Sequence, residues 1–327
     1  MSERGAPPVR LAVDLGGTTT RVALVRGREV VERREAPTPA REGPGAAVEV
    51  VAALAAPLLS RADGPVCVAA TGHVLGGTVS AVNRETLPGW DAFPLAAALT
   101  ERCGRPVRLV NDAQAAAWGE ARFGAGRGAR DVVFVTVSTG IGAGVVAGGR
   151  LLRGARGLAG HLGFWRGIGP AGDEILERAA SGTAIARAGV AAFGPGVTTR
   201  DVFERAAAGD PAAQAIVADA VDRLARALVD LRWLVDPERV AIGGSVGLAA
   251  GYLPRLAAAL RGLEPRDPLP VVAAELGADA GLLGATDLLG GDGPGTGDAV
   301  DAGDRGDAAG PGGAGPGLDA GGPPPST

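Results

Sequence analysis

Lysine is missing from this chain of 327 residues, so all 32 of its basic residues are arginine. That absence excludes chemistry that depends on a lysine: the phosphate-binding P-loop, the pyridoxal Schiff base and the protein-kinase active site. Cysteine and histidine are nearly absent as well, with only Cys67, Cys103, His73 and His161 present. Two cysteines without metal-ligand spacing make neither a disulfide framework nor a structural zinc site, and we expect both to fill the apolar core.

Long apolar runs are missing too, although 46% of the residues are hydrophobic. No run reaches the roughly 20 residues that a membrane-spanning helix needs. The start of the chain lacks the apolar segment of a signal peptide. We therefore expect a cytoplasmic protein that has no membrane partner.

The acidic charge is confined to the end of the chain. The formal net charge is −4, and residues 290–327 hold six Asp and one Arg, so the other residues carry about +1. Without a basic stripe, the composition gives no support for a nucleic-acid partner. Residues 290–327 are almost entirely Gly, Pro, Ala and Asp, which cannot bury a core, so we expect a disordered tail there.

The remaining chain has the pattern of a mixed α/β protein with two similar halves. Each half opens with a strand, a glycine-rich turn and a second strand, at 10–25 and at 132–147. Further strands are expected at 29–35, 65–70, 107–110, 239–242 and 269–274, and helices at 46–59, 94–103, 113–123, 211–234 and 280–289. The repeated opening predicts two related lobes that face a cleft.

The first glycine-rich turn is a candidate phosphate site, and it reads Asp14-Leu-Gly16-Gly17-Thr18-Thr19. Glycines allow backbone N–H groups to approach a phosphate closely, and Thr18 and Thr19 can add hydroxyl donors. Asp14 ends the strand and is placed to hold Mg²⁺ through water, because hard divalent cations prefer carboxylate and water oxygens. The alternative is a plain hairpin turn.

A second turn, at residues 138–144, offers a matching site in the other half. Residues 142–147 fit the loosened dinucleotide fingerprint G-x-G-x-x-A, but that fingerprint has to open a helix, whereas this sequence continues a hairpin. Two such turns, one in each lobe, are better explained as two phosphate-binding turns on either side of a triphosphate. The residues expected at this phosphate site are Thr139, Gly140, Gly142 and Gly144.

The third candidate is the pair Asn111-Asp112, where a predicted strand gives way to a predicted helix. A helix N-terminus favours an ionised carboxyl group because of the helix dipole. There, the Asp112 carboxylate could accept the proton of a sugar hydroxyl that attacks a γ-phosphoryl group. The alternative is that Asp112 simply caps the helix.

Six motifs in order resemble the ROK (repressor, open reading frame, kinase) family throughout residues 9–288. They are Asp14-Leu-Gly-Gly-Thr, Asn111-Asp-Ala-Gln-Ala-Ala-Ala-Trp118, Ser138-Thr-Gly-Ile-Gly, Gly157-Leu-Ala-Gly-His161, Gly243-Gly-Ser-Val-Gly-Leu248 and Asp279-Ala-Gly-Leu-Leu-Gly-Ala285. The resemblance implies the two-lobed actin/Hsp70/sugar-kinase (ribonuclease H-like) ATPase fold. It implies an N-terminal lobe at 9–111 on which the last helix, 279–289, packs back, a C-terminal lobe at 112–278 and a disordered tail at 290–327.

The resemblance also implies roles for single residues. Asp112 would be the base for the 6-hydroxyl of a sugar, and ATP and Mg²⁺ would be required. The residues implied to bind the sugar are Gly72, Asn83, Asn111, Asp112, His161 and Glu177. Gly243 and Gly244 would approach the adenosine, and a homodimer is usual for the family.

One motif departs from the family pattern, which has a structural zinc site after the position of His161. Phe164 replaces the expected zinc histidine, and the three zinc cysteines are gone. We therefore expect no zinc site, and we expect Phe164 and Trp165 to be buried and to hold this loop by packing.

Several motifs are most similar to the bacterial branch of the family that phosphorylates N-acetylmannosamine, which makes N-acetylmannosamine 6-phosphate the expected product. Two alternatives stay open. The chain could be a kinase for glucose or another N-acetylhexosamine, or a non-catalytic protein that senses sugars. The family's repressors carry an N-terminal helix-turn-helix, and there is no room for one before Arg10.

Overall fold

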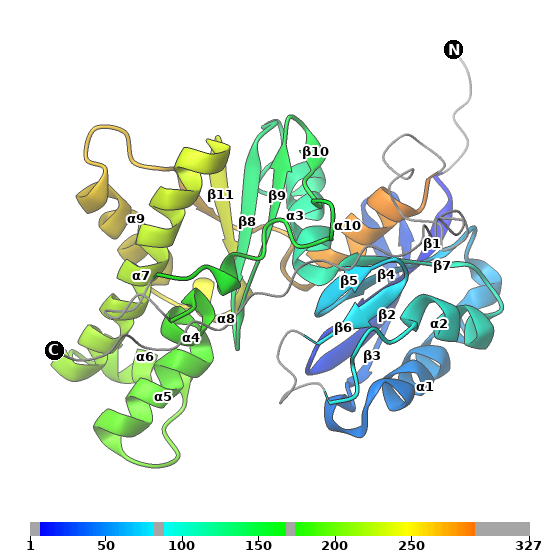
Figure 1. The fold of residues 1–327 in the computed structure, drawn as a ribbon, viewed down its shortest axis with the longest axis horizontal. Helices are drawn as coiled ribbons and strands as arrows, with labels where there is room; N and C mark the ends of the chain where they lie inside the picture. The colour runs from blue at the N-terminus through cyan, green and yellow to red at the C-terminus, as the bar shows by residue number, and fades with distance from the viewer. Residues whose placement is uncertain (1–6, 82–87, 168–173, 292–327) are drawn as a thin grey trace, which may run out of the picture.

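In the computed structural model, residues 7–81, 88–167 and 174–291 are described, and they form two lobes (Figure 1). The expectations for Asn83 and for a disordered tail fall on residues 82–87 and 292–327, outside this part of the chain. Each lobe is built on one five-stranded sheet, and the predicted two-lobed α/β fold is confirmed.

The two sheets have the same topology. In the first, two antiparallel pairings are followed by two parallel ones in the order β3-β2-β1-β4-β7, and the second repeats this as β10-β9-β8-β11-β12. The strands of the first sheet are β1 (Val9–Leu15), β2 (Thr19–Arg26), β3 (Glu29–Pro37), β4 (Val66–Ala70) and β7 (Val107–Asn111). Those of the second are β8 (Val132–Val137), β9 (Ile141–Ala147), β10 (Arg150–Leu151), β11 (Arg239–Gly243) and β12 (Val271–Ala273).

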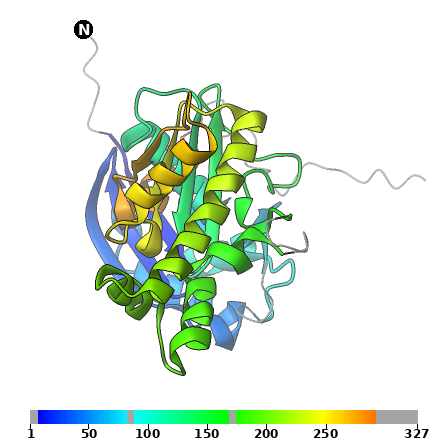
Figure 2. The same cartoon turned by 90° about the vertical axis from the view of Figure 1, so that its left-hand side faces the viewer.

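Helices cover both sheets, as Figures 1 and 2 show. The first lobe carries α1 (Pro44–Ala55), α2 (Leu95–Cys103) and a hairpin of β5 (His73–Leu75) and β6 (Thr78–Ser80). The second lobe carries α4 (Leu176–Ala180), α5 (Gly182–Phe193), α6 (Thr199–Ala207), α7 (Pro211–Val235), α8 (Gly244–Gly247) and α9 (Tyr252–Leu263). Two helices, α3 (Asp112–Phe123) and α10 (Ala280–Leu289), lie between the sheets. Short 3₁₀ turns are η1 (Ala40–Glu42), η2 (Leu59–Arg61), η3 (Leu162–Phe164) and η4 (Gly277–Asp279).

Alternation along β1 decides which way Asp14 points. Successive side chains of a strand face opposite sides of the sheet, and Leu11 and Val13 pack in the core with residues of α1. Ala12 faces the other way and packs with Leu282 and Leu283 of α10. Asp14 shares this second face, so the strand directs its carboxylate toward the space between the lobes.

The two central helices cross at glycines. A Cβ atom added to Gly284 of α10 would meet the carbonyl oxygen of Ala115 in α3, and one added to Gly119 would meet the carbonyl oxygen of Ala280. The backbones are therefore in direct contact, and a side chain at either position would push the helices apart. This crossing fixes the helix that begins at Asp112 against the first lobe, because α10 also packs on β1 and β4.

A buried carboxylate joins the two places where the chain passes between the lobes. Glu120 of α3 is fully buried. Its side chain accepts hydrogen bonds from the backbone N–H of Ala125 (2.8 Å), Glu275 (3.2 Å) and Leu276 (2.8 Å). The first of these donors follows α3 and the other two precede α10, so one side chain holds both crossings together.

Two further predictions concern the core and the membrane. Cys67 and Cys103 are both buried and unpaired, which confirms their expected place in the apolar interior. Among the helices of the described ranges, none is both long and apolar enough to cross a membrane.

Candidate active site

Asp14 is paired with an arginine across the first hairpin. Its Oδ2 lies 3.1 Å from Nη1 of Arg21, and the antiparallel register places these two residues opposite each other. Burial raises the pKa of Asp14, against the opposing effect of the Arg21 and Arg33 charges. The two arginines thus only partly offset the cost of removing the Asp14 carboxylate from water. A bound cation would stabilise the ionised form of this carboxylate.

The turn after Asp14 leaves its tip open. The hydroxyl of Thr38 donates to the carbonyl oxygen of Gly16 at 2.8 Å, which holds the base of the turn. Gly17 and Thr18 are exposed, and no atom lies within 4 Å of a Cβ built on Gly17. The backbone here can be approached by a ligand.

Asp112 occupies the first turn of α3, and Asn111 caps this helix. The Asn111 Oδ1 accepts the backbone N–H of Gln114 at 3.1 Å, so the alternative that Asp112 is the capping residue is wrong. Asp112 Oδ1 accepts from Asn111 Nδ2 at 3.0 Å and from the N–H of Ala113 at 2.8 Å. The capping role falls to Asn111 because its extended backbone places its side chain over the first free N–H groups.

Burial, helped by the nearby charge of Asp14, raises the pKa of Asp112 to about 7, against the opposing effect of hydrogen bonds from Ala113, Thr71 and Asn111. A general base works best with a pKa near the operating pH. The side chain that would hold Mg²⁺ is that of Asp14, through water, because hard divalent cations prefer carboxylate and water oxygens.

Gly72 joins the first lobe to this junction. Its carbonyl oxygen accepts from Asn111 Nδ2 at 2.9 Å. The residue has a φ of +101°, and a Cβ there would lie 2.7 Å from the carbonyl oxygen of Ser80. Only glycine satisfies both conditions, and the bond fixes the amide of Asn111 beside Asp112.

The second turn and the Gly243-Gly244 turn lie side by side. The Oγ atoms of Ser138 and Ser245 are 3.0 Å apart. Gly244 has a φ of +83°, and a Cβ there would meet the carbonyl oxygen of Val137. The structure therefore brings together the expected phosphate and adenosine positions of the second lobe, and Thr139 is exposed at the tip.

Gly142 and Gly144 have a packing role that the sequence did not reveal. Both lie on β9, and added Cβ atoms would lie 3.1 Å from Cβ of Ala113 and 2.6 Å from Cβ of Ala117, respectively. Their missing side chains let α3 lie directly on the strand. Of the second turn, the tip at Thr139 and Gly140 is the part left for a ligand.

The Glu177 carboxylate is hydrogen-bonded to the backbone of the second turn. Its Oε2 accepts the backbone N–H of Ile141 at 3.0 Å, and a Cβ added to Gly140 would lie 2.5 Å from the same oxygen. The carboxylate is partly exposed. Glu177 is thus bound to the phosphate turn, and its other oxygen is the one that could reach a sugar.

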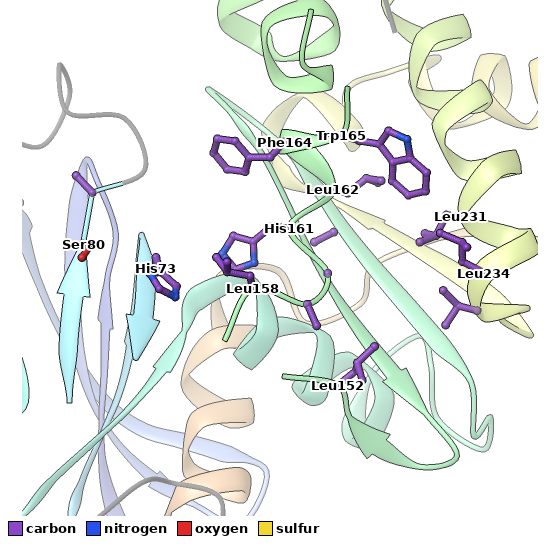
Figure 3. Close-up of a pocket in the computed structure, with 15 residues that line it drawn as sticks. His73, Ser80, Leu152, Leu158, His161, Leu162, Phe164, Trp165, Leu231 and Leu234 are labelled. Carbon is purple, nitrogen blue, oxygen red and sulfur yellow. The ribbon is translucent and has the colours of Figure 1, made fainter. Parts of the chain in front are cut away.

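His161 presents unpaired nitrogen atoms. Both ring nitrogens are buried, and neither has a hydrogen-bond partner in the described ranges. Burial lowers the pKa of His161, so its ring is neutral at pH 7. Figure 3 shows the ring projecting from the second lobe toward the hairpin that carries His73 and Ser80. A neutral imidazole with free nitrogens can both donate to and accept from a polar ligand.

A cavity of about 850 Å³ adjoins His161 (Figure 3). Among the predicted site residues that the structure describes, His161 alone lines it. The other walls are mostly apolar: Leu152, Leu158, Leu162, Phe164, Trp165, Leu231, Leu234 and Val235. The carboxylates of Asp14, Asp112 and Glu177 therefore do not line this cavity.

The expected burial of Phe164 is wrong. Phe164 is 37% exposed and lines the cavity, with its ring centre 6.4 Å from that of His161. Trp165 is partly buried and packs against the core of the second lobe. The short η3 turn directs the two rings differently, because Trp165 follows the turn in extended backbone that leads back to the core. No group of three or more His, Cys, Asp or Glu suited to a metal ion occurs in the described part of the chain.

Three residues of this site were not predicted: Arg21, Thr71 and Gln114. A signal for Arg21 was available, since a tight hairpin places it opposite Asp14 and on the same face. Thr71 follows β4 directly, where parallel strands end at the same edge as β7. Gln114 belongs to the Asn111-Asp112 motif, but its contacts are with a distant loop that sequence reasoning did not place.

The family model described as the ROK family matches residues 10–291. The bifunctional enzyme NanE/NanK of Brucella melitensis is 49% identical over 278 residues, 85% of this chain and 53% of that protein. The chain therefore spans about half the length of this relative. The N-acetylmannosamine kinase of Citrobacter koseri is 42% identical over 295 residues, 86% of this chain and 99% of that protein.

Solved structures agree with the fold. A ROK hexokinase from Thermus thermophilus has a TM-score of 0.75 and 37% identity, with 85% of this chain and 96% of that chain covered. A ROK family glucokinase from Streptomyces griseus, in complex with glucose and AMPPNP, has a TM-score of 0.73 and 30% identity, with 86% and 98% covered.

Proposed function

This chain belongs to the ROK family, and from that premise we propose that it is an ATP-dependent kinase that phosphorylates N-acetylmannosamine on its 6-hydroxyl. The observation that carries the proposal is Asp112, a base of raised pKa in the first turn of α3. It lies near Asp14, at the point where β7 gives way to α3. The similarity to relatives named N-acetylmannosamine kinase supports the choice of sugar.

In the proposed reaction, the Asp112 carboxylate accepts the proton of the 6-hydroxyl as that oxygen attacks the γ-phosphorus of ATP. The new O–P bond forms while the bond from the γ-phosphorus to the β-γ bridging oxygen breaks, and ADP leaves. Asn111 orients the acceptor hydroxyl beside the base. The backbone N–H of Gly16 closes its own turn by donating to the carbonyl oxygen of Thr19 at 3.2 Å. The N–H groups of Gly17 and Thr18, and those of Thr139 and Gly140 in the second turn, bind the phosphate oxygens.

Mg²⁺, held by Asp14 through water, would neutralise charge that develops on the phosphate oxygens. Arg21 keeps the Asp14 carboxylate in place at 3.1 Å. His161 and Glu177 contribute polar groups to the sugar from the second lobe, and Gly72 fixes Asn111 from the first. Gly243 and Gly244 contact the adenosine.

Two other functions are tested against this one. A kinase for glucose or another N-acetylhexosamine would use the same residues for phosphoryl transfer. The structural similarity to a hexokinase and a glucokinase supports this alternative. A non-catalytic sugar sensor would not need a carboxylate with a pKa of about 7 at the start of α3. The intact base favours a kinase.

The deciding experiment measures ADP release by the purified full chain with ATP and Mg²⁺. N-acetylmannosamine, N-acetylglucosamine, glucose and mannose are compared, and mass spectrometry identifies the product. The highest kcat/KM is expected with N-acetylmannosamine. A higher value with glucose would move the assignment to the first alternative, and sugar binding without ADP release would move it to the second.

We also propose a homodimer that covers the exposed end of α7. Trp233 is 79% exposed and Leu234 is 73% exposed, and aromatic residues of this kind are typical of protein interfaces. Light scattering on the wild type and on Trp233→Ser tests it. A dimer is expected for the wild type and a shift toward monomer for the variant, and a monomeric wild type would refute the proposal.

A further inference from the structure

The segment that carries His161 is held from two sides. We call residues 153–161 the His161 loop. The His73 Nε2 atom lies 2.5 Å from the carbonyl oxygen of Arg156, and since a carbonyl only accepts, this nitrogen carries the proton. The side-chain amide of Gln114 donates to the carbonyl oxygens of Gly157 (3.2 Å) and Ala159 (3.0 Å).

Gln114 is unusual in its burial. It is 1% exposed, and both N–H bonds of its amide are used on the His161 loop. Burying an amide is costly unless its hydrogen bonds are made, so the position is specified by these two bonds. Its backbone N–H is bound by Asn111, which ties the same residue to the helix turn that begins with Asp112.

The loop has little freedom to sit elsewhere. Gly157 has a φ of +71°, and a Cβ there would lie 2.5 Å from the carbonyl oxygen of Val74 in β5. Gly160 has a φ of +84°, and a Cβ there would lie 3.1 Å from Cα of Gly144. The backbone of the His161 loop thus touches the first-lobe hairpin on one side and β9 on the other.

We propose that Gln114 is a positioning residue that determines which sugars are accepted. It fixes the His161 loop to the first turn of α3, and so sets the distance between the His161 ring and the Asp112 carboxylate. The proposal rests on the proposed function, because it assigns the two ends of that distance to the sugar. Gln114 itself touches neither the sugar nor the phosphate.

Loss of the Gln114 amide should affect sugar binding and proton transfer differently. Asp112 keeps its own hydrogen bonds from Asn111 and Ala113 when the Gln114 amide is lost. The His161 ring projects beside Leu158 toward the hairpin (Figure 3). Its nitrogens have no hydrogen-bond partner in the described ranges, so without the Gln114 bonds to its loop the ring would lose its fixed place. Sugar binding and discrimination should weaken more than proton transfer or ATP binding.

The test compares Gln114→Met with wild type and with Gln214→Met. Methionine keeps the volume and removes both donors. Gln214 is the control for the substitution itself, because it is exposed and its amide donates to a backbone carbonyl far from the site, that of Ala206, at 3.2 Å in the second lobe. For each protein, kcat and KM are measured for N-acetylmannosamine, N-acetylglucosamine and ATP, together with Tm.

For Gln114→Met we expect the KM for N-acetylmannosamine to rise about 10-fold, the effect of losing two ordinary hydrogen bonds. Preference over N-acetylglucosamine should fall by a similar factor, with the KM for ATP within about twofold of wild type. Gln214→Met should leave every kinetic constant unchanged. If Gln114→Met does not fold, Gln114→Asn, which keeps the amide on a shorter side chain, is measured by the same criteria.

Unchanged sugar KM and preference would overturn the proposal. A parallel loss in kcat, both KM values and Tm would also overturn it, since that is the mark of a purely structural role. A wild type that phosphorylates no sugar would instead refute the proposed function, which separates the two failures.

Discussion

The side-chain amide of Asn111 donates to two groups at once, the carbonyl oxygen of Gly72 at 2.9 Å and the Oδ1 atom of Asp112 at 3.0 Å. The first bond reaches the strand end of one lobe, and the second fixes the proposed base at the helix start. One amide thus couples the position of the base to the sheet of the first lobe.

Replacing Asp112 by Asn should abolish phosphoryl transfer while sugar binding remains, because an amide cannot take the proton. A loss in kcat of about 10²–10⁴-fold is expected, the usual contribution of a general base. Single-turnover kinetics and calorimetric sugar titration measure the two effects. A variant that keeps more than about a tenth of the wild-type kcat would refute the assignment of the base.

The same variant should be more stable than the wild type at neutral and alkaline pH. The folded-state pKa of Asp112 is raised to about 7, so the folded protein holds this proton more tightly than the unfolded chain does. Stability is then lost as the pH rises from about 4 to about 7. Asp112→Asn removes that loss and should gain about 1–3 kcal/mol at pH 8 but little at pH 4. Urea unfolding at both pH values checks the sign.

Activity should follow the ionisation of the same group. The base acts only when ionised, so kcat/KM for the sugar should rise with pH and level off above an apparent pKa of about 7. The profile of Asp112→Asn should lack this rise. A wild-type profile that is flat between pH 5.5 and 8.5 would contradict the raised pKa.

The neighbouring rings Phe164 and Trp165 should differ in their contribution to stability. Trp165 packs on the core of the second lobe, so Trp165→Ala should cost about 2 kcal/mol. Phe164 is 37% exposed, so Phe164→Ala should cost less than about 0.5 kcal/mol. Denaturant unfolding of both variants measures the difference, and equal costs would mean that the loop packs differently.

The crossing of α3 and α10 should tolerate no added methyl group. Gly284→Ala places a Cβ against the carbonyl oxygen of Ala115, and a cost of about 1–3 kcal/mol is expected for such overpacking. Gly262→Ala in α9 is the matched control, since no atom lies within 4 Å of its Cβ. That change should be neutral or slightly stabilising because alanine favours helix. Tm values of the two variants would decide.

Zinc should be absent from the purified protein, as the sequence predicts. A closed tetrahedral site needs thiolate or imidazole ligands, and the His161 loop and the turn after it offer only His161 between 153 and 167. Elemental analysis should find less than about 0.1 zinc per chain, and a chelator should leave Tm unchanged. One zinc per chain would show that ligands come from elsewhere in the fold.

Much of this fold follows from local patterns in the sequence. The predicted helix at 211–234 is α7 (Pro211–Val235), because Asp210 caps its first turn and Pro211 suits its first position. The strands before each glycine turn were also predictable from short β-branched runs. The hairpin β5–β6 was not, since its strands have three residues each, too few for a clear alternating pattern.

Part of the candidate site was predictable from the sequence as well, and part was not. Asp14 and Asp112 stand at strand ends, where a motif and a strand boundary are enough to place them. The exposure of Phe164 depends on the backbone direction after η3, and the bonds of Gln114 join residues 43 and 45 positions apart. Contacts between residues so far apart in sequence depend on tertiary packing, and local residue patterns do not predict them.

The chain passes between the lobes at two places, and the buried carboxylate of Glu120 binds these two segments to each other. Two independent connections would let the lobes slide past each other as well as open. With Ala125 and Leu276 bound to the same side chain, sliding would break hydrogen bonds to a carboxylate that water cannot reach. We therefore expect any movement of one lobe against the other to be a rotation about Glu120. Such a rotation would return the two lobes to the same alignment each time.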